Sequence, residues 1–239
     1  MKAMVFAAGL GTRLRPLTDT LPKALVDVNG RPMLWHVLGR LAEAGITEAV
    51  INTHHFHEKI AEFLAAGGSR GLRVTLSREE EFPLETGGGL KKAVAFLSGG
   101  GPFLACNADV WSELDLKALL AAHAASGALA TLAVRDRPSK RRLLFDGGLA
   151  LKGREGETGA AGLRPLAFSG IQALSPEIFG RMTEEGVFSI ASVYLRMAAA
   201  GERINGFLDE SPFWSDIGDL ERLESVRLRA SLISVNKNI

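Results

Sequence analysis

Short apolar runs alternate in the first half of the chain with segments in which apolar residues recur every third or fourth position. The runs have the length and composition of buried strands, and they cover residues 3–8, 49–52, 73–77, 103–106 and 130–134. The periodic segments predict helices at residues 33–42, 57–64, 86–96 and 116–125. This alternation of strand and helix predicts a parallel sheet with right-handed crossover connections.

The pattern changes after residue 135. Two apolar runs on either side of Asp146-Gly147-Gly148 predict a hairpin within residues 141–151. Further strands are expected at residues 166–174, 204–207 and 213–216, helices at 176–182, 190–200 and 219–229, a glycine-rich loop at 153–163 and a frayed tail at 231–239. We therefore expect an α/β fold with a Rossmann-like, mixed but mostly parallel sheet flanked by helices, and a small β-rich lobe in the second half.

The first strand runs into a loop that carries glycines and cations. Gly9 and Gly11 let backbone N–H groups approach anionic oxygens, and Arg13 and Lys23 add positive charge. The loop is not a dinucleotide fingerprint, because Leu14 occupies the position of the third glycine, which disfavours a Rossmann oxidoreductase. No Gly-Lys-Ser or Gly-Lys-Thr occurs in the chain, so a Walker loop is excluded. The loop therefore predicts a phosphate-binding site.

Two aspartates follow predicted strands from distant parts of the chain. Asp109 follows strand 103–106, and Asp216 ends strand 213–216. Open parallel sheets bind ligands beyond the carboxyl ends of their strands, and Mg²⁺ takes one or two carboxylates together with substrate phosphate oxygens. Each aspartate could instead cap the N-terminus of a following helix. The nearby anion-binding loop favours the metal interpretation.

Composition limits the remaining classes of function. The formal net charge of the 239 residues is +1, so we expect no nucleic-acid partner and no anionic membrane surface. The single cysteine, Cys106, excludes an internal disulfide and is expected to be buried. No apolar stretch has the length of a membrane span, and no signal-peptide pattern opens the chain, so the cytoplasm is expected. A zinc site at His54, His55 and His57 is less favoured than loop polarity or a substrate contact, and the run 79–81 of three glutamates is interpreted as a solvated turn.

The motifs together resemble the sugar-phosphate nucleotidyltransferases, also called nucleotide-sugar pyrophosphorylases. They are AAGLGTRLRPLT at 7–18, PKALV at 22–26, LETGGG at 84–89, NADVW at 107–111, FSGI at 168–171 and FWSDIG at 213–218. The resemblance implies that a sugar-1-phosphate oxygen attacks the α-phosphorus of a nucleoside triphosphate, with Mg²⁺ as cofactor and pyrophosphate as leaving group. Such chemistry depends on positioning and charge neutralisation.

The resemblance also assigns roles to residues. It implies catalytic roles for Arg13, Lys23 and Asp109, and metal binding by Asp109 and Asp216. The nucleotide would contact Ala8, Gly9, Gly11, Thr12, Arg13, Gly87, Gly88 and Asn107. The sugar phosphate would contact Lys23, Glu85, Ser169 and Gly170. One nucleotidyltransferase domain, 1–239, would then bind the nucleotide mainly through residues 1–135 and the sugar phosphate mainly through 136–218, with 219–230 as a closing helix.

Within the family, these motifs on a short chain most resemble the uridylyltransferases that act on N-acetylmuramate 1-phosphate in cell-wall recycling. Guanylyl, thymidylyl or cytidylyl transfer to another sugar-1-phosphate or to phosphocholine stays open, as does a non-catalytic nucleotide sensor. The chain lacks the family's V-E-K-P lysine motif, which leaves Lys140, Arg141 and Arg142 as candidates for the sugar-phosphate cation. The sequence leaves the oligomeric state open.

Overall fold

The first half of the chain forms the parallel part of a central sheet. In the computed structural model, which describes residues 1–157 and 159–236, the strand order here is β5-β4-β1-β6. The strands are β1 (Lys2–Phe6), β4 (Glu48–Thr53), β5 (Arg73–Arg78) and β6 (Phe103–Asn107), and all neighbours pair in parallel. Ala3, Met4 and Val5 are fully buried, as expected for a strand covered on both faces.

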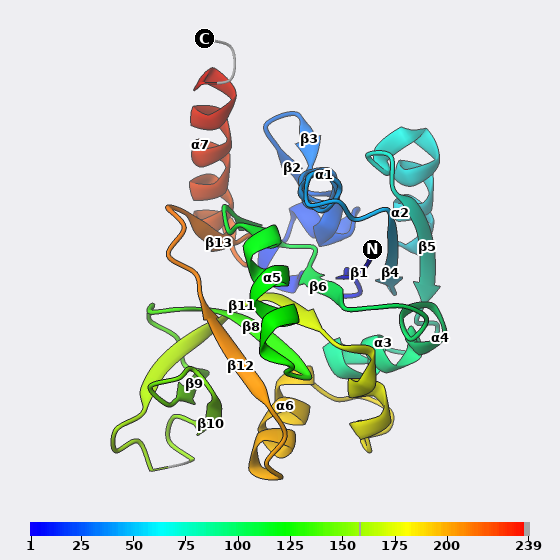
Figure 1. The fold of residues 1–239 in the computed structure, drawn as a ribbon. Helices are drawn as coiled ribbons and strands as arrows, with labels where there is room; N and C mark the ends of the chain where they lie inside the picture. Colours follow the sequence, from blue (N-terminus) through cyan, green and yellow to red (C-terminus); the bar gives the residue numbers. More distant parts are fainter. Residues whose placement is uncertain (158, 237–239) are drawn as a thin grey trace.

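The second half adds antiparallel pairs to the same sheet. The long strand β11 (Arg164–Leu174) pairs on one edge with β6 and β9 (Arg142–Phe145), and on the other with β8 (Ala130–Arg135). β10 (Leu151–Arg154) forms the predicted hairpin with β9, and β12 (Ile204–Leu208) pairs in parallel with β8. Within the described residues, nine strands therefore form one mixed sheet (Figure 1).

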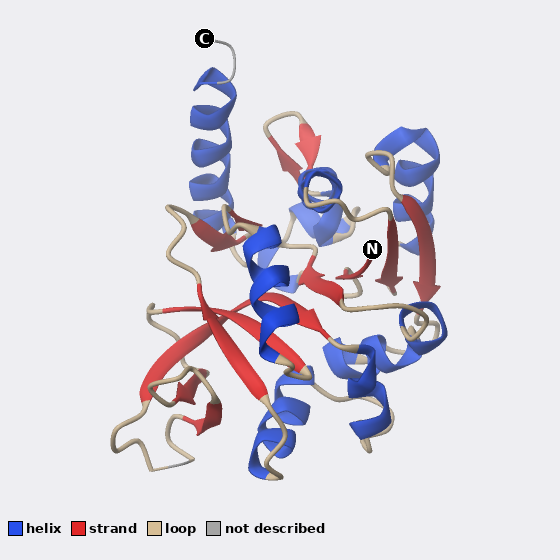
Figure 2. Ribbon diagram, viewed as in Figure 1, coloured by secondary structure: helices blue, strands red, loops and turns tan. Residues whose placement is uncertain are grey.

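Helices cover both faces of this sheet (Figure 2). They are α1 (Met33–Glu43), α2 (His57–Phe63), α3 (Glu85–Lys92), α4 (Val94–Leu97), α5 (Leu116–Ser126), α6 (Ile190–Ala199) and α7 (Leu220–Asn236). Alternate residues of β1 belong to two different hydrophobic cores: Val5 to the core that contains Leu38 of α1, and Met4 to the core that contains Tyr194 of α6. The predicted α/β fold, a Rossmann-like mixed sheet flanked by helices, is confirmed.

The structure differs from the prediction in several helices. The predicted helix 86–96 breaks at Ala93 into α3 and α4, and Pro176–Arg181 forms a 3-10 helix. The predicted fraying of residues 231–239 is wrong for residues 231–236, which continue α7. Leu223, Val226 and Ala230 bury one side of that helix and hold it on the core. Residues 237–239 lie outside the described residues.

Short strands that were not predicted, β2 (Asp27–Val28), β3 (Arg31–Pro32) and β7 (Val110–Ser112), lie near the carboxyl ends of the parallel strands, and the predicted strand at 213–216 is confirmed as β13 (Trp214–Asp216). β2 and β3 form a small hairpin. β7 pairs in antiparallel fashion with β13. The second pair is important for the site, because it joins the two segments that carry the predicted aspartates.

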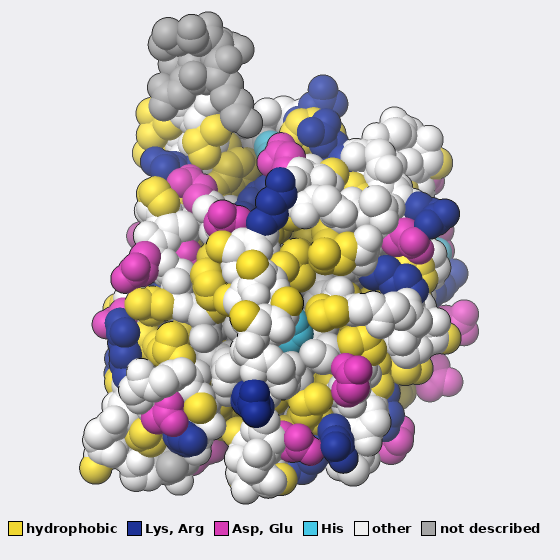
Figure 3. All heavy atoms as spheres, viewed as in Figure 1, with side chains coloured by type: hydrophobic (Ala, Val, Ile, Leu, Met, Phe, Trp, Pro, Cys, Tyr) yellow, Lys and Arg dark blue, Asp and Glu magenta, His cyan; other side chains and the backbone are white. Residues whose placement is uncertain are grey.

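One expectation from composition, the burial of Cys106, is confirmed. Desolvation raises the pKa of the Cys106 thiol to about 12. On the face drawn in Figure 3, Lys and Arg side chains are interspersed with Asp and Glu. Across the described residues, no helix combines the length and apolarity needed to cross a membrane.

Candidate active site

The loop after β1 is held by contacts that bring Lys23 beside it. The Ala7 N–H donates to Asn52 Oδ1 at 2.8 Å, which ties the loop to the end of β4. Gly11 has a φ of +65°, and a Cβ there would lie 3.1 Å from Lys23 Cβ and 3.1 Å from Thr18 Cγ2. A side chain at Gly11 would therefore be strained and crowded. The Thr18 hydroxyl closes this turn by donating to the Gly11 carbonyl at 2.8 Å.

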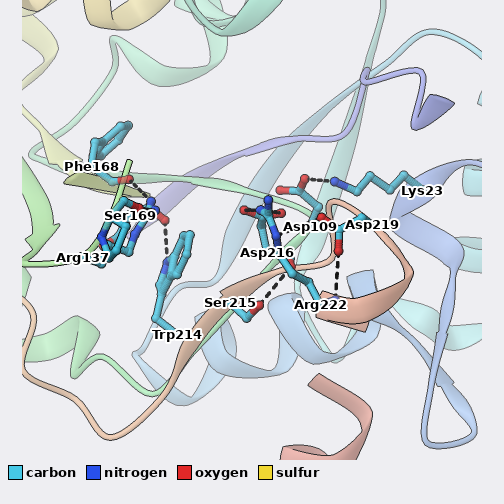
Figure 4. A network of polar contacts seen from close by, with 11 residues as sticks. Lys23, Asp109, Arg137, Phe168, Ser169, Trp214, Ser215, Asp216, Asp219 and Arg222 are labelled. Atoms are coloured by element: carbon cyan, nitrogen blue, oxygen red, sulfur yellow. Dashed lines mark hydrogen bonds and ion pairs between the residues drawn. The ribbon is translucent and has the colours of Figure 1, made fainter. Parts of the chain in front are cut away.

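Lys23 and Asp109 form an ion pair across 86 positions of sequence (Figure 4). The exposed fractions of the two side chains are 14% and 27%. Both groups are therefore partly desolvated, which strengthens their attraction over that of an exposed pair. The predicted catalytic lysine and aspartate are thus direct neighbours.

Asp216 lies next to Asp109 because of the register between β7 and β13. Asp216 is opposite Val110 in this pair, and the Ile217 N–H donates to the Asp109 carbonyl at 2.9 Å. Both carboxylate oxygens of Asp216 accept from Arg222 Nη1, at 2.7 and 2.6 Å. The two predicted metal ligands therefore lie close together, Asp109 in the turn just before β7 and Asp216 on β13, and each is paired with one cation of the chain itself.

Arg13 approaches the same place from the opening loop. A Cβ built on Gly218 would lie 3.2 Å from Arg13 Nη2 and 2.2 Å from Asp216 Oδ1. Gly218 thus allows a guanidinium and a carboxylate to meet over its backbone. Arg13 and Thr12 are exposed and begin a 3-10 helix, Thr12–Leu14, whose N-cap is Gly11.

A cleft of about 260 Å³ opens beside the Lys23–Asp109 pair, close to the lower end of the size range of small-molecule sites. Gly9 faces open space, with no atom within 4 Å of a Cβ built there. The predicted site residues that line the cleft are Ala8, Gly9, Lys23, Glu85, Asn107 and Asp109, together with Asn52, Pro83 and Thr86.

The glycines of LETGGG are required by packing between segments. A Cβ on Gly87 would lie 2.4 Å from the Phe188 ring, and a Cβ on Gly88 would lie 2.3 Å from the Gly186 carbonyl oxygen. The N–H groups of Gly87 and Gly88 both donate to the Phe188 carbonyl. These two N–H groups are therefore already engaged within the protein. Glu85 and Thr86, which precede the glycines, line the cleft instead. Base binding by Gly87 and Gly88 stays a prediction.

A buried carboxylate that the sequence reasoning missed holds this segment in place. Glu79 is only 2% exposed, so the interpretation of residue 79 as part of a solvated turn is wrong. Its Oε1 accepts from Asn52 Nδ2 and its Oε2 from the Leu84 N–H, both at 2.7 Å. Asn52 in turn binds Ala7. Glu79 thus connects the opening loop to the start of α3 through charge-assisted hydrogen bonds.

Ser169 and Gly170 lie at an irregularity of β11. The register with β8 shifts between Phe168 and Gln172. Gly170 has a φ of +75°, and a Cβ at this position would lie only 2.7 Å from Asn107 Nδ2. The Ser169 carbonyl accepts from Trp214 Nε1 at 2.9 Å, while its buried hydroxyl has no partner. The predicted sugar-binding strand therefore meets the strand that carries Asp216.

The candidates for the sugar-phosphate cation are arranged differently from expectation. Arg142 is committed to a two-bond ion pair with Glu155, and Lys140 and Arg141 are exposed. Arg137, which the sequence reasoning did not single out, stacks on Trp214 with 3.9 Å between guanidinium carbon and ring centroid. Its neighbourhood in the sequence, RDRPSKRR, gave no signal that this arginine would face the site.

The histidine cluster is engaged in local contacts. His57 Nδ1 is 2.7 Å from Thr53 Oγ1, and His54 Nδ1 is 2.7 Å from the Glu79 carbonyl oxygen. In the part of the chain that the structure describes, no group of three or more His, Cys, Asp or Glu side chains could hold a metal ion. The geometry therefore gives these histidines a role in the loops beside the cleft.

Comparison with known proteins identifies the family. The nucleotidyl transferase family matches residues 2–143, which is more than half of the chain. The chain belongs to this family. It is 37% identical to an N-acetylmuramate alpha-1-phosphate uridylyltransferase of Neisseria meningitidis serogroup B over 237 residues, covering 96% of this chain and 98% of that one.

A second curated relative and a solved structure extend the comparison. A probable mannose-1-phosphate guanylyltransferase 1 of Oryza sativa is 34% identical over 91% of this chain and 61% of its own length. The fold is shared with a putative glucose-1-phosphate thymidylyltransferase from Bacillus anthracis, at a TM-score of 0.82 and 19% identity over 96% of this chain and 95% of that chain. The two sequence relatives are named for different bases and different sugars.

The network around Glu79 generates a stability prediction. Glu79→Gln preserves the shape but replaces one acceptor oxygen by a donor that faces either Leu84 N–H or Asn52 Nδ2. We expect a loss of about 1–3 kcal/mol in the free energy of unfolding, because a buried donor is left unsatisfied. Urea unfolding followed by circular dichroism measures it. Glu80→Gln is the matched control, since Glu80 is exposed; equal stabilities of the two variants would contradict the role of Glu79.

Proposed function

We propose that this protein transfers UMP from UTP to N-acetylmuramate 1-phosphate, giving UDP-N-acetylmuramate and pyrophosphate, as a step of peptidoglycan recycling in the cytoplasm. The observation that carries the proposal of nucleotidyl transfer is the convergence of Lys23, Asp109 and Asp216 beside a cleft at the strand ends. The choice of substrates is supported by the uridylyltransferase relative, whose alignment covers nearly all of both chains. The guanylyltransferase relative makes GTP with a mannose phosphate the second candidate.

The chain's own residues suit an in-line displacement at the α-phosphorus. The nucleoside triphosphate would lie along Ala8 to Thr12, where backbone N–H groups would donate to phosphate oxygens and the open face of Gly9 leaves room for them. Lys23 would bridge the attacking sugar phosphate and the α-phosphate, and Arg13 would stabilise charge on the leaving pyrophosphate. These groups hold the reactants and stabilise developing negative charge without covalent participation.

The carboxylates fit a divalent cation. Asp109, just before β7, and Asp216, on β13, would supply oxygen ligands from paired segments, and two carboxylates completed by substrate phosphate oxygens are a typical set for Mg²⁺. The present partners of the two carboxylates, Lys23 and Arg222, are cations, so the place already favours positive charge. When bound there, Mg²⁺ would neutralise charge on the phosphates.

Pyrophosphate release tests the function directly. The four nucleoside triphosphates are incubated in turn with a panel of sugar-1-phosphates and with phosphocholine, with Mg²⁺ present, and released pyrophosphate is measured. We expect the highest kcat/KM for UTP with N-acetylmuramate 1-phosphate. Release only with GTP and a mannose-type phosphate would replace the proposed substrates by the second candidate. No release from any pair would favour a nucleotide-sensing role.

Lys23 is the residue whose removal tests the proposed chemistry. Lys23→Met keeps the aliphatic stem but removes the charge, so we expect kcat to fall on the order of 10²–10³-fold, with a small change in the KM for UTP. Steady-state kinetics measure both constants. Lys117→Met serves as the control, because Lys117 is exposed on α5. A kcat near that of the parent would rule out the bridging role of Lys23.

Asp216 tests the metal assignment. Asp216→Asn retains the size of the side chain but removes a charged oxygen ligand, so we expect weaker Mn²⁺ binding in the presence of UTP, measured by electron paramagnetic resonance, and a higher Mg²⁺ requirement for turnover. Asp136→Asn is the matched control, since Asp136 is exposed. If Asp216→Asn binds Mn²⁺ as tightly as that control, Asp216 is not a ligand.

A further inference from the structure

Arg137 is held by the carbonyls of Phe168 and Pro138 and by one aromatic ring, that of Trp214. It lies just after β8, and its Nη2 donates to the Phe168 carbonyl at 3.1 Å. Its guanidinium lies flat against Trp214, whose indole N–H is itself fixed by the Ser169 carbonyl (Figure 4). The irregular part of β11 therefore orients both the cation and the ring on which it stacks. Such a cage restricts the rotamers of a long side chain before any ligand arrives.

Among the described residues, no carboxylate lies within ion-pair distance of this cation, and its main electrostatic partner is Asp216. Other arginines of the same region form ion pairs: Arg135 pairs with Asp209 at 3.0 Å, Arg142 with Glu155 at 2.7 Å and Arg222 with Asp216 at 2.6 Å. Arg137 forms no ion pair with any carboxylate of the described residues, and its buried Nε has no hydrogen-bond partner. Burial also lowers its pKa, which reflects the cost of desolvating the charge.

A second polar group nearby is also buried without a partner. Ser169 is fully buried, and its hydroxyl makes no hydrogen bond in the structure. Its carbonyl fixes the ring on which Arg137 stacks, so the two unpartnered groups belong to one cluster. Buried polar groups without partners are uncommon in folded proteins and require an explanation. Both groups therefore lie where the fold leaves hydrogen-bonding capacity unused.

The position of the cage relative to the aspartates indicates which part of a ligand it would meet. Trp214 and Asp216 are two residues apart on β13, so their side chains emerge from the same face, with Cα atoms about 7 Å apart. That separation is close to the width of one sugar ring. A sugar whose 1-phosphate lies between Lys23 and the two aspartates would therefore present a substituent on the other side of its ring to Arg137.

We propose that Arg137 binds an anionic substituent of the sugar ring, of which a carboxylate is the simplest, and thereby selects acidic sugar-1-phosphates over neutral ones. This inference rests on the nucleotidyl transfer proposed above. N-acetylmuramate carries a lactyl carboxylate on O3 that N-acetylglucosamine lacks. The two 1-phosphates therefore differ in the group that Arg137 would bind. The planar fork of the guanidinium matches a carboxylate with two parallel hydrogen bonds.

The experiment compares these two 1-phosphates with UTP for the parent, Arg137→Ala and Arg137→Lys. For Arg137→Ala we expect KM to rise about 10- to 100-fold with N-acetylmuramate 1-phosphate, while KM for N-acetylglucosamine 1-phosphate and for UTP stays near the parental value. Arg137→Lys keeps the charge but loses the fork, so an intermediate KM is expected. Arg164→Ala is the control, because Arg164 is an exposed arginine at the start of β11, the strand whose Phe168 carbonyl accepts from Arg137. Thermal melts establish that all variants are folded.

The outcomes separate this inference from the proposed function. If the parent releases no pyrophosphate with either sugar, the proposed function fails on its own. If the parent is active and Arg137→Ala raises both sugar KM values equally, Arg137 binds the 1-phosphate and the inference is overturned. It is also overturned if Arg137→Ala and Arg137→Lys both retain the parental preference for the acidic sugar while remaining folded.

Discussion

Two carboxylates held close together by the pairing of β7 with β13 are the constraint around which this site is built. The register of β7 and β13 brings the segments of Asp109 and Asp216 together, and like charges in a partly desolvated place repel each other. Each is compensated by a cation from another part of the chain, Lys23 from the opening loop and Arg222 from the first turn of α7. The loop after β1, the end of β6, and the start of α7 are thereby fixed to one point. The closing helix is part of the site for this reason as well as a cover for the core.

A second set of buried polar groups holds the side of the cleft formed by the opening loop and α3. Parallel strands end at one edge, but the loops that follow them have few contacts of their own. Asn52 and Glu79 supply these contacts by joining the ends of β4 and β5 to the opening loop and to the segment before α3. The three glycines in α3, at 87–89, allow this helix to pack within contact distance of Asn52, Gly186 and Phe188. The cleft is therefore shaped by hydrogen bonds between strand ends, which preorganises it for a ligand.

Periodicity predicted most strands and helices, because the alternation of apolar runs and helical faces directly reports burial in an α/β sheet. It could not predict that β11 enters between β6 and β8, since strand order depends on contacts between distant residues. Strand-end logic correctly paired Asp109 with Asp216 in space. It missed Glu79 and Arg137 because a charged residue in a polar run has the same signal whether its side chain faces solvent or a buried partner. Only the tertiary structure distinguishes Arg137 from Arg141, four positions later.

Lys23 and Arg137 differ in how far their positive charge is compensated by carboxylates of the chain. The charge of Lys23 is largely cancelled by Asp109, so its attraction for a phosphate is weak until that carboxylate engages another cation. Arg137 has no carboxylate at ion-pair distance among the described residues, and burial lowers its pKa although the more distant charge of Asp216 acts in the opposite direction. Proteins keep such unfavourable burial of a charge at functional sites, where the free energy of ligand binding compensates for it. The arrangement therefore separates two tasks: Lys23 responds to the charge that accumulates around the aspartates, whereas Arg137 attracts an anion independently of it.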